Sequence, residues 1–212
     1  MIKAIVFDLD GTLLNTLDDL HASVNYTMEK FGCPTLEKNQ VRALLGNGIR
    51  YMIHGALPEN RRDETDEILP VFKAYYDEHK DDNTAPYDGV IEMLKLVRKA
   101  GYKTAIVSNK YDQAVQQLKD GLFGGYIDFA LGQVDGIANK PAPDGVWLAL
   151  EKLGVEREEA VYVGDSEVDL LTAKNSCLRC IACSWGFRDR EDLIGHGATE
   201  IIDNPVELLE VL

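Results

Sequence analysis

Five short, largely apolar segments, each followed by a polar residue or a glycine, are the feature that most constrains how this chain can fold. They comprise residues 3–7, 103–107, 127–131, 160–163 and 180–183. Each has the length of a strand and is apolar on both faces, as expected of a strand that helices cover on both sides. Helical periodicity fills the intervals, for example over 90–98 and over 146–153, where Gly154 is expected to end the helix. This alternation predicts an α/β fold with a parallel sheet and right-handed crossovers.

The region from Asn15 to Asn83 interrupts the alternation directly after the first predicted strand. It has helical periodicity and no convincing strand. It is also far longer than the roughly 2–6 residues of an ordinary loop between a strand and a helix. We therefore expect two parts, a core formed by 1–14 and 84–212 and an inserted all-helical subdomain formed by 15–83.

The balance of charge limits the partners that the chain can have. There are 22 Lys and Arg residues against 36 Asp and Glu residues, which gives a formal net charge of -14. Nucleic acids and anionic membranes favour clusters of basic residues, so neither is expected as a partner. A small anionic substrate remains possible, because a single site can supply its own positive charge.

The N-terminus and the cysteines favour a cytoplasmic protein. The apolar run at residues 1–8 is too brief for a signal peptide, and no stretch reaches the roughly 18 apolar residues of a membrane span. The four cysteines are Cys33, Cys177, Cys180 and Cys183. We expect them to be free thiols packed in the core, with Cys180 and Cys183 on opposite faces of one strand.

Residues that can do chemistry follow four of the predicted strands. They are Asp8-Leu9-Asp10-Gly11-Thr12, Ser108-Asn109-Lys110, Asn139-Lys140-Pro141 and Gly164-Asp165-Ser166-Glu167-Val168-Asp169. Ligands of an open parallel sheet bind at the carboxyl ends of its strands, so the four groups should converge on one crevice. A single aspartate in such a place is often only a helix cap or a turn residue. Four together are better explained by a functional site.

Each group has a role if the substrate is a phosphate ester. Asp8 can act as the nucleophile and Asp10 as the general acid and base. Mg²⁺ prefers carboxylate oxygens, and Asp8 and Asp165 can hold it. Ser108 and Lys140 can bind the phosphoryl oxygens that do not react. The residues therefore predict Mg²⁺-dependent phosphoryl chemistry.

In this order and spacing the four groups resemble the four motifs of the haloacid dehalogenase superfamily. The superfamily's dehalogenases lack a second acid in the first motif, so Asp10 points to a phosphatase or phosphotransferase. The resemblance implies a Rossmann-like core, an aspartyl-phosphate on Asp8, and Mg²⁺ bound by Asp8, Asp165 and the backbone carbonyl of Asp10. The inserted region matches the position of the superfamily's helical cap.

The same resemblance implies roles for further residues of the core motifs. Asn109 is implied to bind phosphate together with Ser108 and Lys140. Asp169 is implied either to bind the metal through water or to orient Lys140. Both roles belong to the same crevice as the reacting aspartates.

Within the superfamily, the chain looks most like the phosphoglycolate phosphatase group. Gly46-Asn47-Gly48 and Arg50 resemble that group's substrate-facing cap loop, where the planar guanidinium of Arg50 can bind a carboxylate. The alternative is an ordinary turn between helices followed by a solvated arginine. Asn15 departs from the group, which usually has Asp there, whereas some pyrophosphatase-like relatives have Asn.

These observations predict a Mg²⁺-dependent phosphatase that acts on a small phosphorylated metabolite such as phosphoglycolate. An inorganic pyrophosphatase and a broad sugar-phosphate phosphatase would use the same core residues. A phosphoacceptor signalling module also uses Asp, Ser or Thr, Lys and Mg²⁺, but Asp10 and the cap favour turnover of a small substrate. A non-catalytic binding protein is disfavoured because every motif residue is present.

Overall fold

The computed structural model describes residues 1–212 and divides them into two compact units. The first comprises Met1–Leu14 and Pro86–Leu212, and the second comprises Asn15–Ala85, which ends two residues beyond the expected boundary at 83. The chain passes between the units in the short strands β2 (Leu14–Asn15) and β3 (Ala85–Pro86), which pair with each other. None of the helices combines the length and the apolar character needed to cross a membrane.

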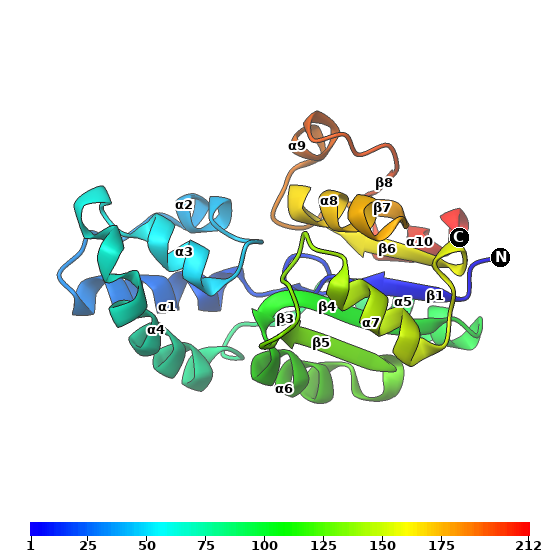
Figure 1. The fold of residues 1–212 in the computed structure, drawn as a ribbon, viewed down its shortest axis with the longest axis horizontal. Helices are drawn as coiled ribbons and strands as arrows, with labels where there is room; N and C mark the ends of the chain where they lie inside the picture. The colour runs from blue at the N-terminus through cyan, green and yellow to red at the C-terminus, as the bar shows by residue number, and fades with distance from the viewer. The chain divides into compact units, whose positions relative to one another are not determined.

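The first unit is built on a six-stranded sheet in which every pair of neighbours is parallel (Figure 1). Its strands are β1 (Ala4–Phe7), β4 (Lys103–Tyr111), β5 (Phe129–Gln133), β6 (Ala160–Gly164), β7 (Arg179–Cys183) and β8 (Ile201–Ile202). They are arranged in the order β5-β4-β1-β6-β7-β8. All five predicted strands are present and the predicted α/β fold class is confirmed. The sixth strand, β8, has two residues and is too short to give an apolar run.

Helices separate the strands, as the periodicity predicted. They are α5 (Val90–Lys99), α6 (Asp112–Leu122), α7 (Asp144–Leu153), α8 (Glu167–Ser176), α9 (Arg190–Gly195) and α10 (Leu208–Val211). Three short 3₁₀ turns, η2 (Gly124–Tyr126), η3 (Arg157–Glu159) and η4 (Pro205–Glu207), lie between them. Helix α7 ends where expected, because Gly154 takes the left-handed conformation with φ of 63°.

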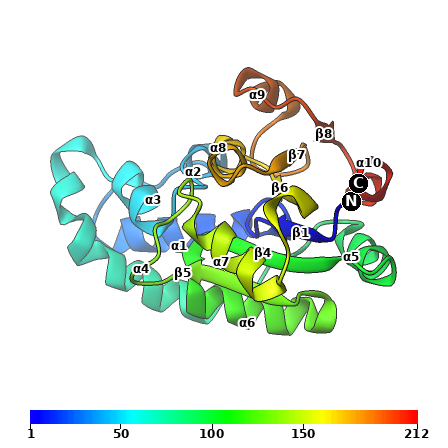
Figure 2. The same ribbon diagram turned by 45° about the vertical axis from the view of Figure 1, so that its right-hand side comes forward.

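The sheet is covered on both faces, which explains why its strands are apolar throughout. In the central strand β1, Ile5 and Phe7 pack into a cluster with residues of α5 and α6. Ala4 and Val6 point the other way, into a cluster with residues of α7. The two helical layers can be followed in Figure 2. All four of these β1 side chains are completely buried, as in a close-packed core.

The second unit is helical, apart from its ends in β2 and β3. It contains α1 (Leu17–Lys30), α2 (Lys38–Ala43), α3 (Ile49–Ala56), the 3₁₀ helix η1 (Glu59–Glu64) and α4 (Thr65–His79). Val24, Ile53 and Phe72 come from three of these helices and are completely buried. The unit therefore has an apolar core of its own.

A buried carboxylate ties together the two ends of the helical unit. Asp19, in the first turn of α1, accepts hydrogen bonds from the backbone N–H groups of Asn83 (3.0 Å) and Thr84 (2.8 Å). The side-chain amide of Asn83 donates a further bond of 2.8 Å to Asp19. The segments that enter and leave the unit are thus held side by side.

The cysteines follow the prediction in part. All four are free, and Cys183 and Cys180 pack on opposite faces of β7, as predicted. The prediction that all four lie in the core is wrong for Cys177, which is exposed. It occupies the position after the last residue of α8 with φ of 61°, a place usually taken by glycine at the surface end of a helix.

The close approach of β5 to the end of β4 requires glycine at position 132, and this can be tested. A Cβ atom on Gly132 would lie 2.5 Å from the carbonyl oxygen of Lys110 and 2.5 Å from Cα of Asp112. We expect Gly132→Ala to destabilise the protein by about 1–3 kcal/mol through overpacking. Gly121→Ala is the matched control, because its Cβ would meet nothing within 4 Å and alanine should stabilise α6 by roughly 0.5–1 kcal/mol. Urea-unfolding midpoints that shift equally in the two variants would contradict this packing.

Candidate active site

The turn after β1 places the first two aspartates at the edge of the sheet. Asp8 continues the strand, with its N–H donating to the carbonyl of Val163 at 2.9 Å, and its side chain is buried. The chain then turns tightly at Gly11, which has φ of 91°. A Cβ atom on Gly11 would lie 2.3 Å from Oδ2 of Asp165. Glycine is therefore required both for the backbone conformation and for the approach of a second strand end.

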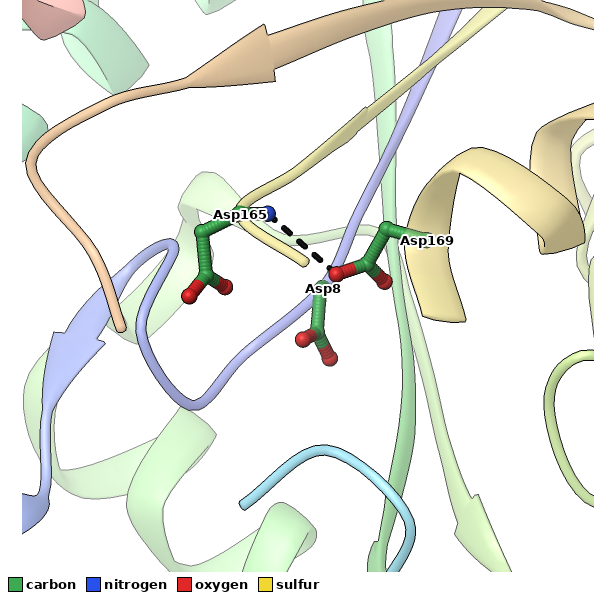
Figure 3. Close-up of side chains that lie close together, drawn as sticks. All are labelled: Asp8, Asp165 and Asp169. Carbon is green, nitrogen blue, oxygen red and sulfur yellow. Dashed lines mark hydrogen bonds between the residues drawn. The ribbon is translucent and has the colours of Figure 1, made fainter. Parts of the chain in front are cut away.

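Three buried carboxylates meet at this edge (Figure 3). Asp8 follows β1, Asp165 follows β6, and Asp169 lies in the first turn of α8. One oxygen atom from each lies within 4.8 Å of the others. The structure therefore brings together Asp8, Asp165 and Asp169, as the positions of their strand ends predicted.

Lys140 lies between two of the carboxylates and pairs with both. Its Nζ atom lies 2.7 Å from Oδ1 of Asp8 and 2.8 Å from Oδ1 of Asp169. Burial would lower the pKa of Lys140, but the charges of Asp169 and Asp8 outweigh that effect and raise it. The raised pKa keeps the lysine positively charged at neutral pH.

Protein donors occupy both oxygens of Asp169. Besides Lys140, the hydroxyl of Tyr162 donates to Oδ1 at 2.9 Å. Oδ2 accepts from the hydroxyl of Ser166 at 2.7 Å and from the N–H groups of Ser166 and Asp165 at 3.1 and 3.2 Å. These contacts leave little room for a metal ion and match the role of orienting Lys140, one of the two roles that the sequence left open.

Asp165 is held differently and keeps free lone pairs. The hydroxyl of Thr12 donates to Oδ1 at 2.9 Å, and the N–H of Phe187 donates to Oδ2 at 2.7 Å. Burial, reinforced by the charge of Asp169, raises the pKa of Asp165 to about 7. Each oxygen has one protein donor, so each can still accept a bond from a cation.

The cluster has more negative charge than its lysine can balance. Burial raises the pKa of Asp8 well above its usual range against the lowering effect of Lys140, and Asp169 and Asp165 raise it further. Carboxylates in such a position are stabilised by a cation, and hard oxygen donors suit Mg²⁺. The donor set of Asp8 and Asp165 therefore fits a divalent metal.

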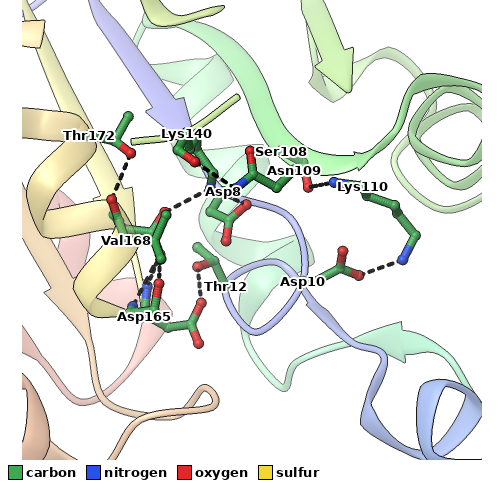
Figure 4. Close-up of polar contacts among 12 residues, drawn as sticks. Asp8, Asp10, Thr12, Ser108, Asn109, Lys110, Lys140, Asp165, Val168 and Thr172 are labelled. Carbon is green, nitrogen blue, oxygen red and sulfur yellow. Dashed lines mark hydrogen bonds and ion pairs between the residues drawn. The ribbon is translucent and has the colours of Figure 1, made fainter. Parts of the chain in front are cut away.

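The end of β4 lies against the same site (Figure 4). Ser108 is buried, and its hydroxyl accepts a bond of 3.2 Å from the N–H of Lys110. The side-chain amide of Asn109 donates to the carbonyl of Lys140 at 3.0 Å, which joins two of the motifs. The Nζ atom of Lys110 lies 2.8 Å from Oδ1 of Asp10.

Sequence reasoning missed several residues of this network. Thr12 and Lys110 lie within the motifs, but their local sequence predicts no role for either. Tyr162 lies in an apolar strand, and its position there predicts only a core residue, because no local pattern shows what a buried hydroxyl binds. The one signal in the sequence for this contact is that Tyr162 stands just before the motif that contains Asp165.

The residues proposed for substrate recognition lie in the helical unit. Gly46, Asn47 and Gly48 connect α2 to α3, with φ of 109° at Gly46 and 85° at Gly48. Arg50 lies in the first turn of α3, and its exposed guanidinium donates two bonds, of 2.8 and 2.9 Å, to the carboxylate of Asp66. These contacts are those expected if the loop is an ordinary turn between helices and Arg50 is a surface arginine, which was the alternative to substrate binding.

Comparison with known proteins agrees with this geometry. Residues 5–183 match the family model described as haloacid dehalogenase-like hydrolase. Phosphoglycolate phosphatase 1 of Pseudomonas aeruginosa is 33% identical, over 98% of this chain and 78% of that protein. N-acetylmuramic acid 6-phosphate phosphatase of the same organism is 31% identical, over 100% of this chain and 95% of that protein.

A solved structure shows the same likeness in three dimensions. A protein from Lactobacillus delbrueckii subsp. bulgaricus, described as a candidate phosphoglycolate phosphatase, superposes with a TM-score of 0.94. It is 38% identical, and the match covers 99% of this chain and 97% of that one. The chain therefore belongs to the haloacid dehalogenase-like hydrolase family, as a phosphatase member of it.

Proposed function

We propose that this phosphatase hydrolyses a small phosphate monoester that also has a carboxylate, as phosphoglycolate does, through a phosphorylated Asp8. The observation that carries the proposal is the buried cluster of Asp8, Asp165 and Asp169 around Lys140. A cluster of this kind is costly to bury unless a cation and a charged substrate use it. It therefore indicates catalysis rather than stability.

In the first step, a carboxylate oxygen of Asp8 attacks the phosphorus and the bond to the leaving oxygen breaks. Asp10 gives its proton to that oxygen, so the product leaves as an alcohol. The ammonium of Lys140 and the hydroxyl of Ser108 hold the phosphoryl oxygens that do not react. Asn109 supports this arrangement by fixing the carbonyl of Lys140.

In the second step, water attacks the phosphorus of the aspartyl-phosphate. Asp10 takes a proton from the water, the bond between phosphorus and Asp8 breaks, and the Asp8 carboxylate is restored with release of inorganic phosphate. Asp10 is thereby returned to its acid form. At the end of the cycle, both aspartates have returned to the states in which they started.

Asp8, Asp165 and the backbone carbonyl of Asp10 would hold Mg²⁺ in this site. The ion supplies charge neutralisation between carboxylates and phosphate, which otherwise repel each other. Asp169 supports the site by orienting Lys140. The helical unit, Asn15–Ala85, is proposed to act as a cap that selects the substrate.

The relatives suggest the class of substrate. Phosphoglycolate and N-acetylmuramic acid 6-phosphate, named in two of them, are both phosphate monoesters that have a carboxylate. We propose the same class for this chain, with Arg50 of the Gly46-Asn47-Gly48 loop binding the carboxylate after releasing Asp66. The pair of Arg50 and Asp66 is exposed, and such pairs contribute little stability.

A panel of substrates tests this function. With Mg²⁺ present, we expect the highest kcat/KM on phosphoglycolate or another carboxylated monoester, and at least roughly tenfold less on an uncharged analogue of equal size, because one charged contact is worth about 1.5–3 kcal/mol. Saturation kinetics on phosphoglycolate, N-acetylmuramic acid 6-phosphate, glucose 6-phosphate and pyrophosphate provide the measurement. A clear preference for pyrophosphate would make the chain a pyrophosphatase.

Substitution of the proposed nucleophile tests the chemistry. Asp8→Asn should abolish turnover while the far-ultraviolet circular dichroism stays unchanged, because an amide cannot displace the leaving oxygen. Asp135→Asn, at an exposed position, is the control and should keep full activity. Appreciable turnover by Asp8→Asn, with deamidation excluded by intact mass, would rule out the covalent mechanism.

Metal binding should stabilise the protein more at high pH. Because the pKa of Asp165 is raised to about 7 in the folded protein, the proton stabilises the metal-free fold fully below about pH 4, and this contribution is lost as pH rises through about 7. Mg²⁺ must displace that proton, so it binds more tightly above pH 7.

The measurement is the shift of the thermal midpoint on adding Mg²⁺ at pH 6 and at pH 8. At one Mg²⁺ concentration, about 100 times the Kd at pH 8, we expect a rise of about 5–10 °C at pH 8 and less at pH 6. Asp165→Asn, which removes one ligand and the titrating group, should reduce the shift at both pH values. An equal shift in wild type and in this variant would contradict the assigned ligands.

A further inference from the structure

A second buried lysine in the core unit has no role in the chemistry described so far. Lys110 lies near the end of β4, and its side chain is only 2% exposed. Its Nζ atom lies 2.8 Å from Oδ1 of Asp10, whose side chain is 19% exposed (Figure 4). The two residues are 100 positions apart in the chain, so the contact depends on the pairing of β4 with β1.

We infer that Lys110 is the positioning residue for Asp10. This inference rests on the proposed function, in which Asp10 exchanges a proton with the leaving oxygen and then with water. An ammonium group only donates hydrogen bonds and has no acceptor. The bond from Lys110 makes Oδ1 of Asp10 the less basic of the two oxygens, so the mobile proton is carried by Oδ2.

The remaining oxygen of Asp10 is available for this work. Oδ2 has no hydrogen-bond partner in the protein, and Figure 4 shows it turned away from Lys110. The backbone of Asp10 is fixed by the tight turn in which Gly11 donates to the carbonyl of Leu14 at 2.8 Å. The turn fixes the main chain and Lys110 fixes the side-chain torsion, so that Oδ2 is presented to the phosphoryl group in one orientation.

The ordering of a single carboxylate matters because proton transfer requires the donor within hydrogen-bond reach of the reacting oxygen. A side chain that rotates freely spends much of its time in unproductive rotamers. Lys110→Met removes the ammonium and keeps the length of the side chain. It leaves Asp10 partly exposed to water rather than buried without a partner, so the fold should tolerate the change.

The leaving group distinguishes positioning from other roles. An alkyl ester such as phosphoglycolate needs a proton on its leaving oxygen, whereas 4-nitrophenolate is a stable anion and leaves without one. The experiment is a single turnover with enzyme in excess, which measures only the first step. Lys110→Met should slow release of the alcohol from phosphoglycolate roughly 10²-fold and release of 4-nitrophenolate less than about threefold.

A double-mutant cycle tests whether Lys110 acts through Asp10. In an Asp10→Asn background, Lys110→Met should change the rate of alcohol release by less than about twofold, because the group it orients is gone. Lys103→Met is the matched control. It makes the same substitution at the other end of β4, where the lysine binds the carbonyl of Leu153, and should leave both rates unchanged.

The outcomes separate this inference from the function on which it rests. A wild-type chain that hydrolyses no alkyl phosphate would contradict the proposed function and the inference with it. An active wild type in which Lys110→Met slows both esters equally, or neither, would contradict the inference alone. A higher KM for phosphoglycolate with an unchanged single-turnover rate would also overturn it and assign Lys110 to substrate binding instead.

Discussion

The contact of Lys140 with Asp8 and Asp169 is the interaction on which the rest of the site depends. Three carboxylates are buried at one edge of the sheet, and this lysine is the cation that lies between two of them. Truncation of Lys140 would leave those charges without a cation beside them, and breaking a buried ion pair typically costs about 3–5 kcal/mol. The lysine therefore supports the strand ends by pairing with both carboxylates, and in the proposed mechanism it also binds the phosphoryl group.

The surrounding protein holds the carboxylates in place by hydrogen bonds, and it leaves some of their oxygen atoms with free lone pairs. Asp169 is bound at both oxygens, whereas Asp165 keeps lone pairs for a metal. Asp10 is bound at one oxygen by Lys110. The carboxylates thus differ in how many hydrogen bonds they accept from the protein, and the proposed division into support, metal binding and proton transfer rests on that difference.

The sequence predicted the strands and the strand-end residues because both depend on local patterns. Apolar runs marked the buried strands, and the carboxyl ends of parallel strands meet by geometry alone. The contacts of Tyr162 and Lys110 could not be predicted, because each depends on a partner from a different strand or helix. Cys177 was misplaced because the end of α8 requires a left-handed residue at the surface. For Arg50, the pairing with Asp66 is a tertiary contact across two helices, beyond the reach of local patterns.

The central claim is that Asp8 becomes phosphorylated during turnover, and acid quenching tests it most directly. Low pH preserves an acyl phosphate long enough for digestion and peptide mapping by mass spectrometry. The account predicts a phosphoryl group on the peptide that contains Asp8, formed within one turnover and lost at the rate at which phosphate is released. Steady hydrolysis without a phosphorylated peptide at any time, or phosphorylation at another residue, would contradict it.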